Sequence, residues 1–193
     1  NSLRERQMQQ QVFEPKRMGN SQLVLKNSFI RSAAYEGMVE RGLPTRQLTG
    51  HHLEMVKGGV GLTTVSYGAV SSDGRTFREQ MYLNRESFDA LGILGRQIHD
   101  AGGKVSIQLT HCGYFSKNKE YKRPLAPSRI FNEYGSLSGI FFSREMDRSH
   151  MERISEDFAR GALEAKKAGF DAVEIHMGHG YLLSQFLSPL TNK

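Results

Sequence analysis

One arrangement of residues occurs three times in this chain of 193 residues: an amphipathic helix that ends at glycine and leads directly into a short apolar run. The three repeats begin with the segments 45–59, 86–103 and 149–169, each of which ends in one or two glycines. Glycine readily takes the left-handed conformation with which many helices end. Short runs rich in β-branched residues favour strands. The chain is therefore predicted to alternate helices with strands.

Four strands are predicted, over residues 27–35, 60–66, 104–109 and 170–176. Strands that alternate with helices pair in parallel through right-handed crossovers, so the fold class is α/β. An open doubly wound sheet and a closed (β/α)8 TIM barrel both fit this alternation. A dinucleotide-binding sheet has clustered glycines after its first strand, whereas residues 33–37 read Ala-Ala-Tyr-Glu-Gly. The barrel is therefore the preferred architecture.

A TIM barrel contains eight β/α units, and this chain is expected to supply about the first four. Four twisted parallel strands cannot close on themselves and leave both sheet edges unpaired. We therefore interpret residues 1–193 as the N-terminal half of a single barrel domain, with a disordered leader at residues 1–11. A long insertion at residues 114–148 is expected to act as a lid. The helix after it is predicted to begin with a capping box formed by Ser149 and Glu152.

Composition and charge narrow the classes of partner. The net charge of +6 is scattered along the chain, which argues against a nucleic-acid interface. The one local cluster of basic residues, Lys117, Lys119, Lys122 and Arg123, indicates a solvated loop or a contact to a small phosphorylated ligand. No apolar run approaches the roughly 18 residues of a membrane span. The single cysteine, Cys112, rules out an intrachain disulfide and favours a reducing, cytoplasmic location.

The C-terminal ends of the predicted strands carry the candidate functional residues, because barrel enzymes gather their active sites there. These residues are mostly small, polar or aromatic and few are charged, a lining that suits a flat neutral heterocycle better than a metal or a polyanion. The residues are Ser32, Ala33, Ala34, Tyr35, Ser66, Tyr67, Gly68, Gln108, His111, His176, His179 and Tyr181.

The residue types alone leave three interpretations of His176 and His179 open. They can donate hydrogen bonds to a ligand, bind a metal ion, or have a purely structural role. A metal site usually needs a third protein ligand, for which Glu174 and His111 are candidates. Gln108 lies in an apolar strand and must therefore find a hydrogen-bond partner, either a ligand or a side chain of a neighbouring strand.

Five segments resemble, in order and spacing, the N-terminal half of the old yellow enzyme family. The likeness is greatest to its NADH:flavin oxidoreductase and 2,4-dienoyl-CoA reductase branch, and it extends from about residue 12 to the end of the chain. The segments are LKNSFIRSAAYEGM, GGVGLTTVSYGAVSSDGR, GGKVSIQLTHCG, PLAPS and AGFDAVEIHMGHGYLLSQFLSPLTNK.

This resemblance implies an FMN-dependent oxidoreductase on a TIM barrel, with NADH or NADPH as electron donor. The implied substrates are small enones or dienoyl thioesters, whose C=C bond is reduced, and no metal is implied. By matched position, His176 and His179 hold the substrate's carbonyl oxygen and Tyr181 supplies a proton. The implied flavin contacts are Ser32, Ala33, Ala34, Tyr35, Tyr67 (through its backbone) and Gln108.

Three positions depart from the pattern of this family: Ser28 and Tyr114 replace frequent arginines, and Tyr35 stands where other branches have Cys or Thr. Relatives also build the FMN phosphate site from later strands, so the 193-residue stretch by itself is expected to be inactive. Two alternatives to the ene-reductase are a non-catalytic half-barrel that pairs with a partner chain, and a metal-dependent hydrolase. Whether the protein forms a homo-oligomer is left open.

Overall fold

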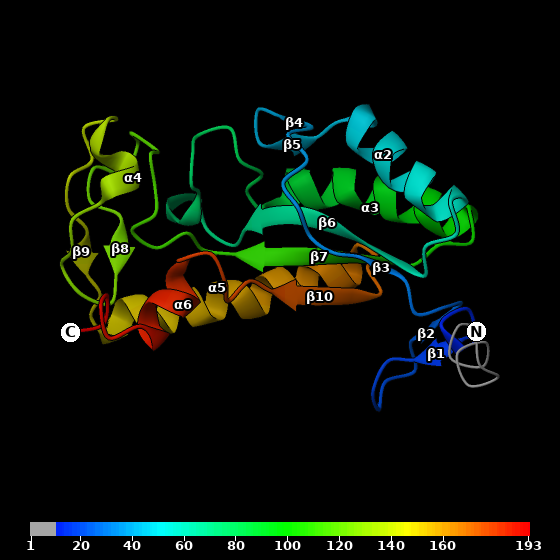
Figure 1. The fold of residues 1–193 in the computed structure, drawn as a ribbon. Helices are drawn as coiled ribbons and strands as arrows, with labels where there is room; N and C mark the ends of the chain where they lie inside the picture. Colours follow the sequence, from blue (N-terminus) through cyan, green and yellow to red (C-terminus); the bar gives the residue numbers. More distant parts are fainter. Residues whose placement is uncertain (1–10) are drawn as a thin grey trace, which may run out of the picture.

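A four-stranded parallel sheet forms the centre of the computed structural model, which describes residues 11–193 (Figure 1). All but the last residue of the expected leader lies outside the described residues. The strands are β3 (Ile30–Arg31), β6 (Leu62–Ala69), β7 (Val105–Thr110) and β10 (Ala172–Ile175), in the spatial order β10-β7-β6-β3. Each strand pairs with the next one along the chain, without the reversal of order that defines a doubly wound sheet.

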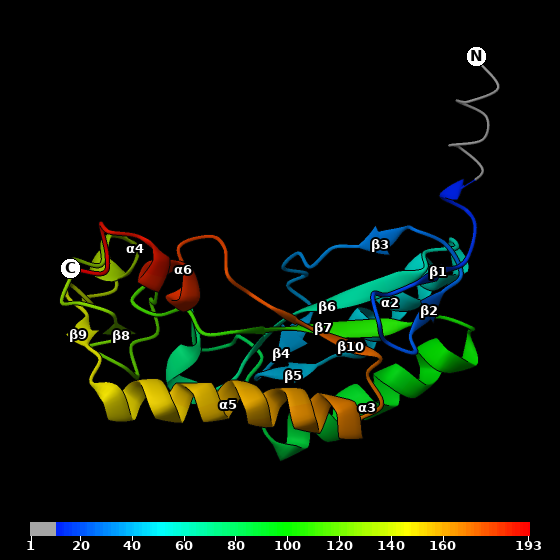
Figure 2. The same cartoon turned by 90° about the horizontal axis from the view of Figure 1, so that it is seen from below.

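Three long helices follow the first three strands: α2 (Arg46–Lys57), α3 (Arg85–Asp100) and α5 (Arg148–Lys167). Figure 2 shows α3 and α5 running along the same side of the sheet. The glycines that end these helices were predicted correctly. Gly59, Gly102 and Gly169 have φ angles of 96°, 75° and 91°, in the left-handed region that side chains disfavour.

The two faces of the sheet have different chemistry. On the helix side, Val65, Ile107 and Leu109 are fully buried and pack in one core with the apolar stripes of the helices. On the opposite side, Thr64 Oγ1 lies 2.7 Å from Ser106 Oγ, in a pair of hydroxyls joined across β6 and β7. This alternation follows from the two-residue period of strands. It leaves polar groups on the face that points away from the helices.

The first strand is much shorter than the predicted 27–35. Its ladder ends at Arg31, which pairs with Thr63 of β6. One guanidinium N–H of Arg31 then donates to the carbonyl of Thr64 at 2.6 Å. Because a side chain occupies that carbonyl, the backbone beyond Arg31 leaves the ladder and has no regular secondary structure up to residue 38.

The predicted capping box of α5 is wrong in its position. Asp147 is the N-cap, and its carboxylate accepts the backbone N–H of His150 at 3.0 Å. The side chain of Ser149 donates to Asp147 instead of capping the helix itself. Asp and Ser are comparable N-cap residues, so the local sequence offered two starts.

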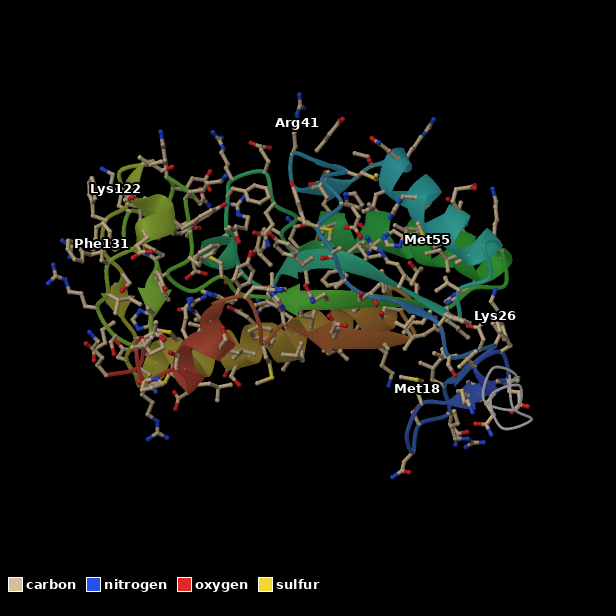
Figure 3. All side chains as sticks on the ribbon, viewed as in Figure 1. Met18, Lys26, Arg41, Met55, Lys122 and Phe131 are labelled. Carbon is tan, nitrogen blue, oxygen red and sulfur yellow. The ribbon has the colours of Figure 1, made fainter. Side chains whose placement is uncertain are left out.

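The insertion, residues 114–148, folds into a small ordered unit beside the C-terminal ends of the strands (Figure 1). It contains β8 (Leu125–Ala126), α4 (Glu133–Ser136) and β9 (Arg144–Glu145), and β8 pairs with β9 in parallel. Figure 3 places Lys122 and Phe131 on this unit, at the opposite end of the molecule from Lys26.

Shorter elements complete the fold. Two antiparallel hairpins form from β1 (Lys16–Arg17) with β2 (Val24–Leu25), and from β4 (Val39–Glu40) with β5 (Leu43–Pro44). A 3-10 turn, η1 (Ser72–Gly74), follows β6, and the helix α6 (Leu182–Leu187) closes the chain. Among residues 11–193, none of the helices combines the length and apolarity needed to cross a bilayer.

Candidate active site

The structure brings His176, His179 and Tyr181 together where β10 ends. The backbone N–H of His176 donates to the carbonyl of Leu109 at 3.0 Å, which continues the pairing of β10 with β7. Tyr181 is the N-cap residue of α6, and its ring centroid lies 4.8 Å from that of His176. The three side chains therefore occupy the C-terminal edge of the sheet, as predicted.

The two imidazoles face each other through nitrogen atoms. Nδ1 of His179 lies 3.4 Å from Nε2 of His176, and the ring centroids are 5.1 Å apart. His179 has a φ of 55°, a left-handed conformation that costs a non-glycine residue energy. Residues in such conformations cluster at active sites and ligand-binding sites. Two nitrogens at this separation can both donate to one oxygen placed beside them, because each can lie about 2.9 Å from it.

His176 is held in its neutral form. Burial lowers its pKa below 6.5, the nearby His179 lowers it further, and the carboxylate of Glu174 acts in the opposite direction. A neutral imidazole has one N–H, so it can donate from Nε2 without bringing a full charge into the site.

The hydroxyl of Tyr181 belongs to a chain of three hydroxyls. Thr76 Oγ1 donates to Tyr181 Oη at 2.9 Å, and Tyr181 Oη donates to Tyr67 Oη at 3.1 Å. Burial raises the pKa of Tyr181 above its ordinary value of 10, so the group stays protonated at neutral pH. Thr76 is a residue that the sequence analysis missed, because it lies in an irregular loop outside any strand end.

Gln108 pairs with the neighbouring strand, one of the two alternatives that the sequence left open. Its side-chain N–H donates to Glu174 Oε1 at 2.5 Å, between strands β7 and β10. The side chain of Gln108 is nearly buried and lies one residue before Leu109, which binds His176. Gln108 is thus close to the histidine pair, and its amide oxygen is the group left to accept a ligand N–H.

The segment Ser32–Tyr35 fits a flat ring with polar edges. It follows β3 without regular secondary structure, and Ser32, Ala34 and Tyr35 are exposed. Within residues 11–193, none of its backbone N–H groups donates to a backbone carbonyl. Such groups require a partner, which water or a ligand can supply. Together with Gln108 across the sheet, these groups fit the edge of a flavin.

His111 and Cys112 do not join this cluster. His111 is fully buried, its Nδ1 accepts the backbone N–H of Gly113, and burial lowers its pKa to about 4. Cys112 is buried as a small apolar residue, and burial raises its pKa to about 12. Across residues 11–193, no three His, Cys, Asp or Glu side chains are grouped so as to hold a metal ion.

The chain matches the family described as NADH:flavin oxidoreductase / NADH oxidase over residues 11–193. The chain belongs to this family. Among its relatives, 4,4'-dithiodibutanoate disulfide reductase of Rhodococcus erythropolis is 35% identical over 94% of this chain and 44% of the relative. NADPH dehydrogenase of Listeria welshimeri is 36% identical over 89% of this chain and 50% of the relative.

The fold of this NADH:flavin oxidoreductase family member is likewise found in solved structures. Morphinone reductase in complex with tetrahydroNAD superimposes with a TM-score of 0.84 at 24% identity, over 94% of this chain and 53% of the other. The predicted architecture is thereby confirmed: the chain forms the N-terminal part of a TIM barrel. It spans about half the length of the curated relatives that it matches.

Family membership confirms the predicted family and its cofactors. FMN with NADH or NADPH are the cofactors of this NADH:flavin oxidoreductase family. The alternatives of a non-catalytic half-barrel and a metal-dependent hydrolase receive no support from these relatives.

Proposed function

We propose that this protein is an FMN-dependent ene-reductase, which takes electrons from NADH or NADPH and reduces a C=C bond conjugated to a carbonyl group. The substrates would be small enones or dienoyl thioesters. One observation carries the proposal: the facing nitrogens of His176 and His179 are 3.4 Å apart at the end of the sheet, and the ring of Tyr181 lies 4.8 Å from that of His176.

Bound FMN would supply hydride to the β-carbon of the substrate. The residues proposed to hold the flavin are the backbone of Ser32, Ala33, Ala34 and Tyr35, the backbone of Tyr67 and the side-chain amide of Gln108. The amide oxygen of Gln108 can accept an N–H from the ring edge, while one N–H of the same amide donates to Glu174 and orients it.

The histidine pair stabilises the charge that develops on the substrate's carbonyl oxygen. His176 donates from Nε2 and His179 from Nδ1 to the same oxygen, so two fixed donors meet the charge where it forms. Preorganised donors of this kind commonly account for a factor of about 100 to 1,000 in rate each. A neutral His176 suits this role, because it donates a hydrogen bond without placing a full positive charge in the site that an uncharged substrate enters.

Tyr181 would protonate the α-carbon as a general acid. Its raised pKa keeps the proton in place until the neighbouring carbon becomes basic. The hydrogen bond from Thr76 fixes the position of the hydroxyl oxygen.

The insertion is proposed to cover the substrate. Phe115 lies 5.9 Å from the ring of Tyr181, and it stacks on Tyr134 of α4 at 4.2 Å with an interplanar angle of 12°. An aromatic contact between the insertion and the site residue supports a lid that excludes water from the reaction.

The test uses the complete gene product. We expect the purified protein to show the visible absorbance of bound flavin, to be bleached by NADH or NADPH without oxygen, and to be reoxidised by an enone. The matched control is the corresponding saturated ketone, which has the carbonyl but no C=C bond and should not reoxidise the flavin. A colourless protein that ignores added FMN would refute the proposal.

A further inference from the structure

The side chain of Tyr67 has no role in the proposed function, which uses only its backbone. Its hydroxyl nevertheless accepts the hydrogen bond of Tyr181 at 3.1 Å. Each hydroxyl carries a single proton. Because Thr76 already donates to the oxygen of Tyr181, the proton of Tyr181 is directed at Tyr67.

A β-bulge aims Tyr67 at this position. Val65 pairs with Ile107 and Gly68 pairs with Leu109, so β6 advances three residues where β7 advances two. The one extra residue of β6 lies in the step formed by Ser66 and Tyr67. Bulges change the direction in which a strand presents its side chains, and they are frequent beside active sites.

Tyr67 is partly buried, and its ring lies between those of the buried Tyr181 and the exposed Tyr35. Tyr181 is 6% exposed, whereas Tyr35 is 54% exposed and its ring lies 5.8 Å from that of Tyr67. The ring of Tyr67 also stacks beside His176, with centroids 6.4 Å apart and an interplanar angle of 28°. No described residue accepts the proton of the Tyr67 hydroxyl.

After Tyr181 gives up its proton, it is a phenolate in a mostly buried position, which is costly unless a proton or a strong donor reaches it. Thr76 already donates one hydrogen bond to this oxygen, and the hydroxyl of Tyr67 is the second one within reach that can turn its proton toward it. We propose that Tyr67 is a positioning residue for Tyr181: it holds the Tyr181 hydroxyl in place and returns a proton to it after each transfer. This inference rests on the proposed function.

The proton balance of the proposed step is complete. The O–H bond of Tyr181 breaks as a C–H bond forms on the substrate's α-carbon. The O–H bond of Tyr67 then breaks as that of Tyr181 reforms, and Tyr67 takes its replacement from water. One solvent proton is consumed per turnover, and no further oxidant or reductant is needed.

The decisive variant is Tyr67→Phe in the complete gene product, because it keeps the ring and removes only the hydroxyl. We expect reoxidation of the reduced flavin by an enone to slow at least about ten-fold. Reduction by the nicotinamide should be unchanged. The double variant Tyr67→Phe/Tyr181→Phe should be no slower than Tyr181→Phe alone, since Tyr67 acts through Tyr181. The control is Tyr82→Phe, which removes a tyrosine hydroxyl outside the site and should leave both half-reactions intact.

A readout independent of turnover is the ultraviolet titration of tyrosinate. Tyr67→Phe removes a donor to the Tyr181 phenolate and should raise the pKa of Tyr181. In the reverse variant, Tyr181→Phe, the pKa of Tyr67 should fall, because its hydrogen bond with Tyr181 raises it. Rescue of activity by Tyr67→Ser would mean that any hydroxyl near the bulge suffices, and it would overturn the positioning role.

Separate outcomes identify which idea fails. If Tyr181→Phe slows reoxidation and Tyr67→Phe does not, the inference on Tyr67 is wrong and the proposed function stands. If Tyr67→Phe slows reduction by the nicotinamide instead, Tyr67 acts on the flavin and the inference is again wrong. If the protein binds no flavin, the proposed function is wrong. The tyrosinate titration still shows in that case whether Tyr67 and Tyr181 change each other's pKa.

Discussion

Arg31 and Glu36 form a buried ion pair, with a guanidinium nitrogen 2.5 Å from Oε1 of Glu36 and only 2% of the Glu36 side chain exposed. The same guanidinium binds the carbonyl of Thr64, and Nε2 of His52 lies 3.4 Å from the carboxylate. The other carboxylate oxygen of Glu36 is buried and has no hydrogen-bond partner among residues 11–193. Arg31 therefore compensates a charge that water cannot reach.

Arg31→Met should lower the free energy of unfolding by about 3–5 kcal/mol, because it leaves the Glu36 carboxylate buried and unpaired. Chemical denaturation measures the change. The matched control is Lys57→Met, which breaks the pair of Lys57 with Glu54, whose side chains are 64% and 69% exposed. That pair should contribute less than about 1 kcal/mol. Equal losses in the two variants would contradict the prediction.

The histidine pair should act as one unit on the carbonyl oxygen. We expect His176→Ala and His179→Ala each to lower kcat/KM for an enone by about 100-fold. The loss in the double variant should be smaller than the product of the two single losses, because both side chains act on the same oxygen. Stopped-flow measurement of flavin reoxidation resolves the step. His99→Ala serves as the control, because His99 pairs with Asp171 at the other end of the sheet. Losses confined to reduction by the nicotinamide would argue against a carbonyl site.

His111 should make the protein less stable in mild acid. Burial lowers its pKa from 6.5 to about 4; the nearby Arg153 acts in the same direction, and Asp73 and Asp157 act against it. Below pH 6.5 the unfolded chain binds a proton that the folded chain does not bind, so stability falls as pH drops from about 6.5 to about 4, by roughly 3 kcal/mol in total.

Urea denaturation near neutral pH and near pH 5 measures this dependence on His111. His111→Gln should flatten the slope over this interval, because glutamine does not titrate. Asp73 has a lowered pKa and contributes in a more acidic range, so its effect is separable. An unchanged slope in His111→Gln would show that another group is responsible.

The lysines of the insertion should matter for phosphorylated ligands. The ammonium of Lys117 lies 5.7 Å from the ring centre of Phe77 and 5.3 Å from that of Tyr134, while Lys119 is exposed nearby. Replacing Lys117, Lys119 and Lys122 with Ala should raise the Michaelis constant for NADPH or a CoA thioester more than for an unphosphorylated enone. Lys16→Ala, Lys57→Ala and Lys104→Ala, combined as a distant triple, provide the control. An equal effect of the two triple variants on the Michaelis constant would show that the charges of the insertion do not contact phosphorylated ligands.

The local pattern of residues determined the elements and their order. Glycines at 59, 102 and 169 end the helices because only a residue without a side chain takes their φ at little cost. The alternation of helices and strands then required parallel pairing. The clustering of His176, His179 and Tyr181 also followed from sequence, because all three lie within six residues of one strand end.

Contacts between distant residues decided the rest. The first strand is cut short by a side chain that reaches a carbonyl 33 residues away. Gln108 finds Glu174 across 66 residues, and Tyr67 meets Tyr181 across 114 residues after a one-residue shift in register. Periodicity reports which face a residue occupies, but it carries no information on register or on which distant polar group a side chain reaches. Those choices are made only when the folded backbone brings hydrogen-bonding groups within reach of one another.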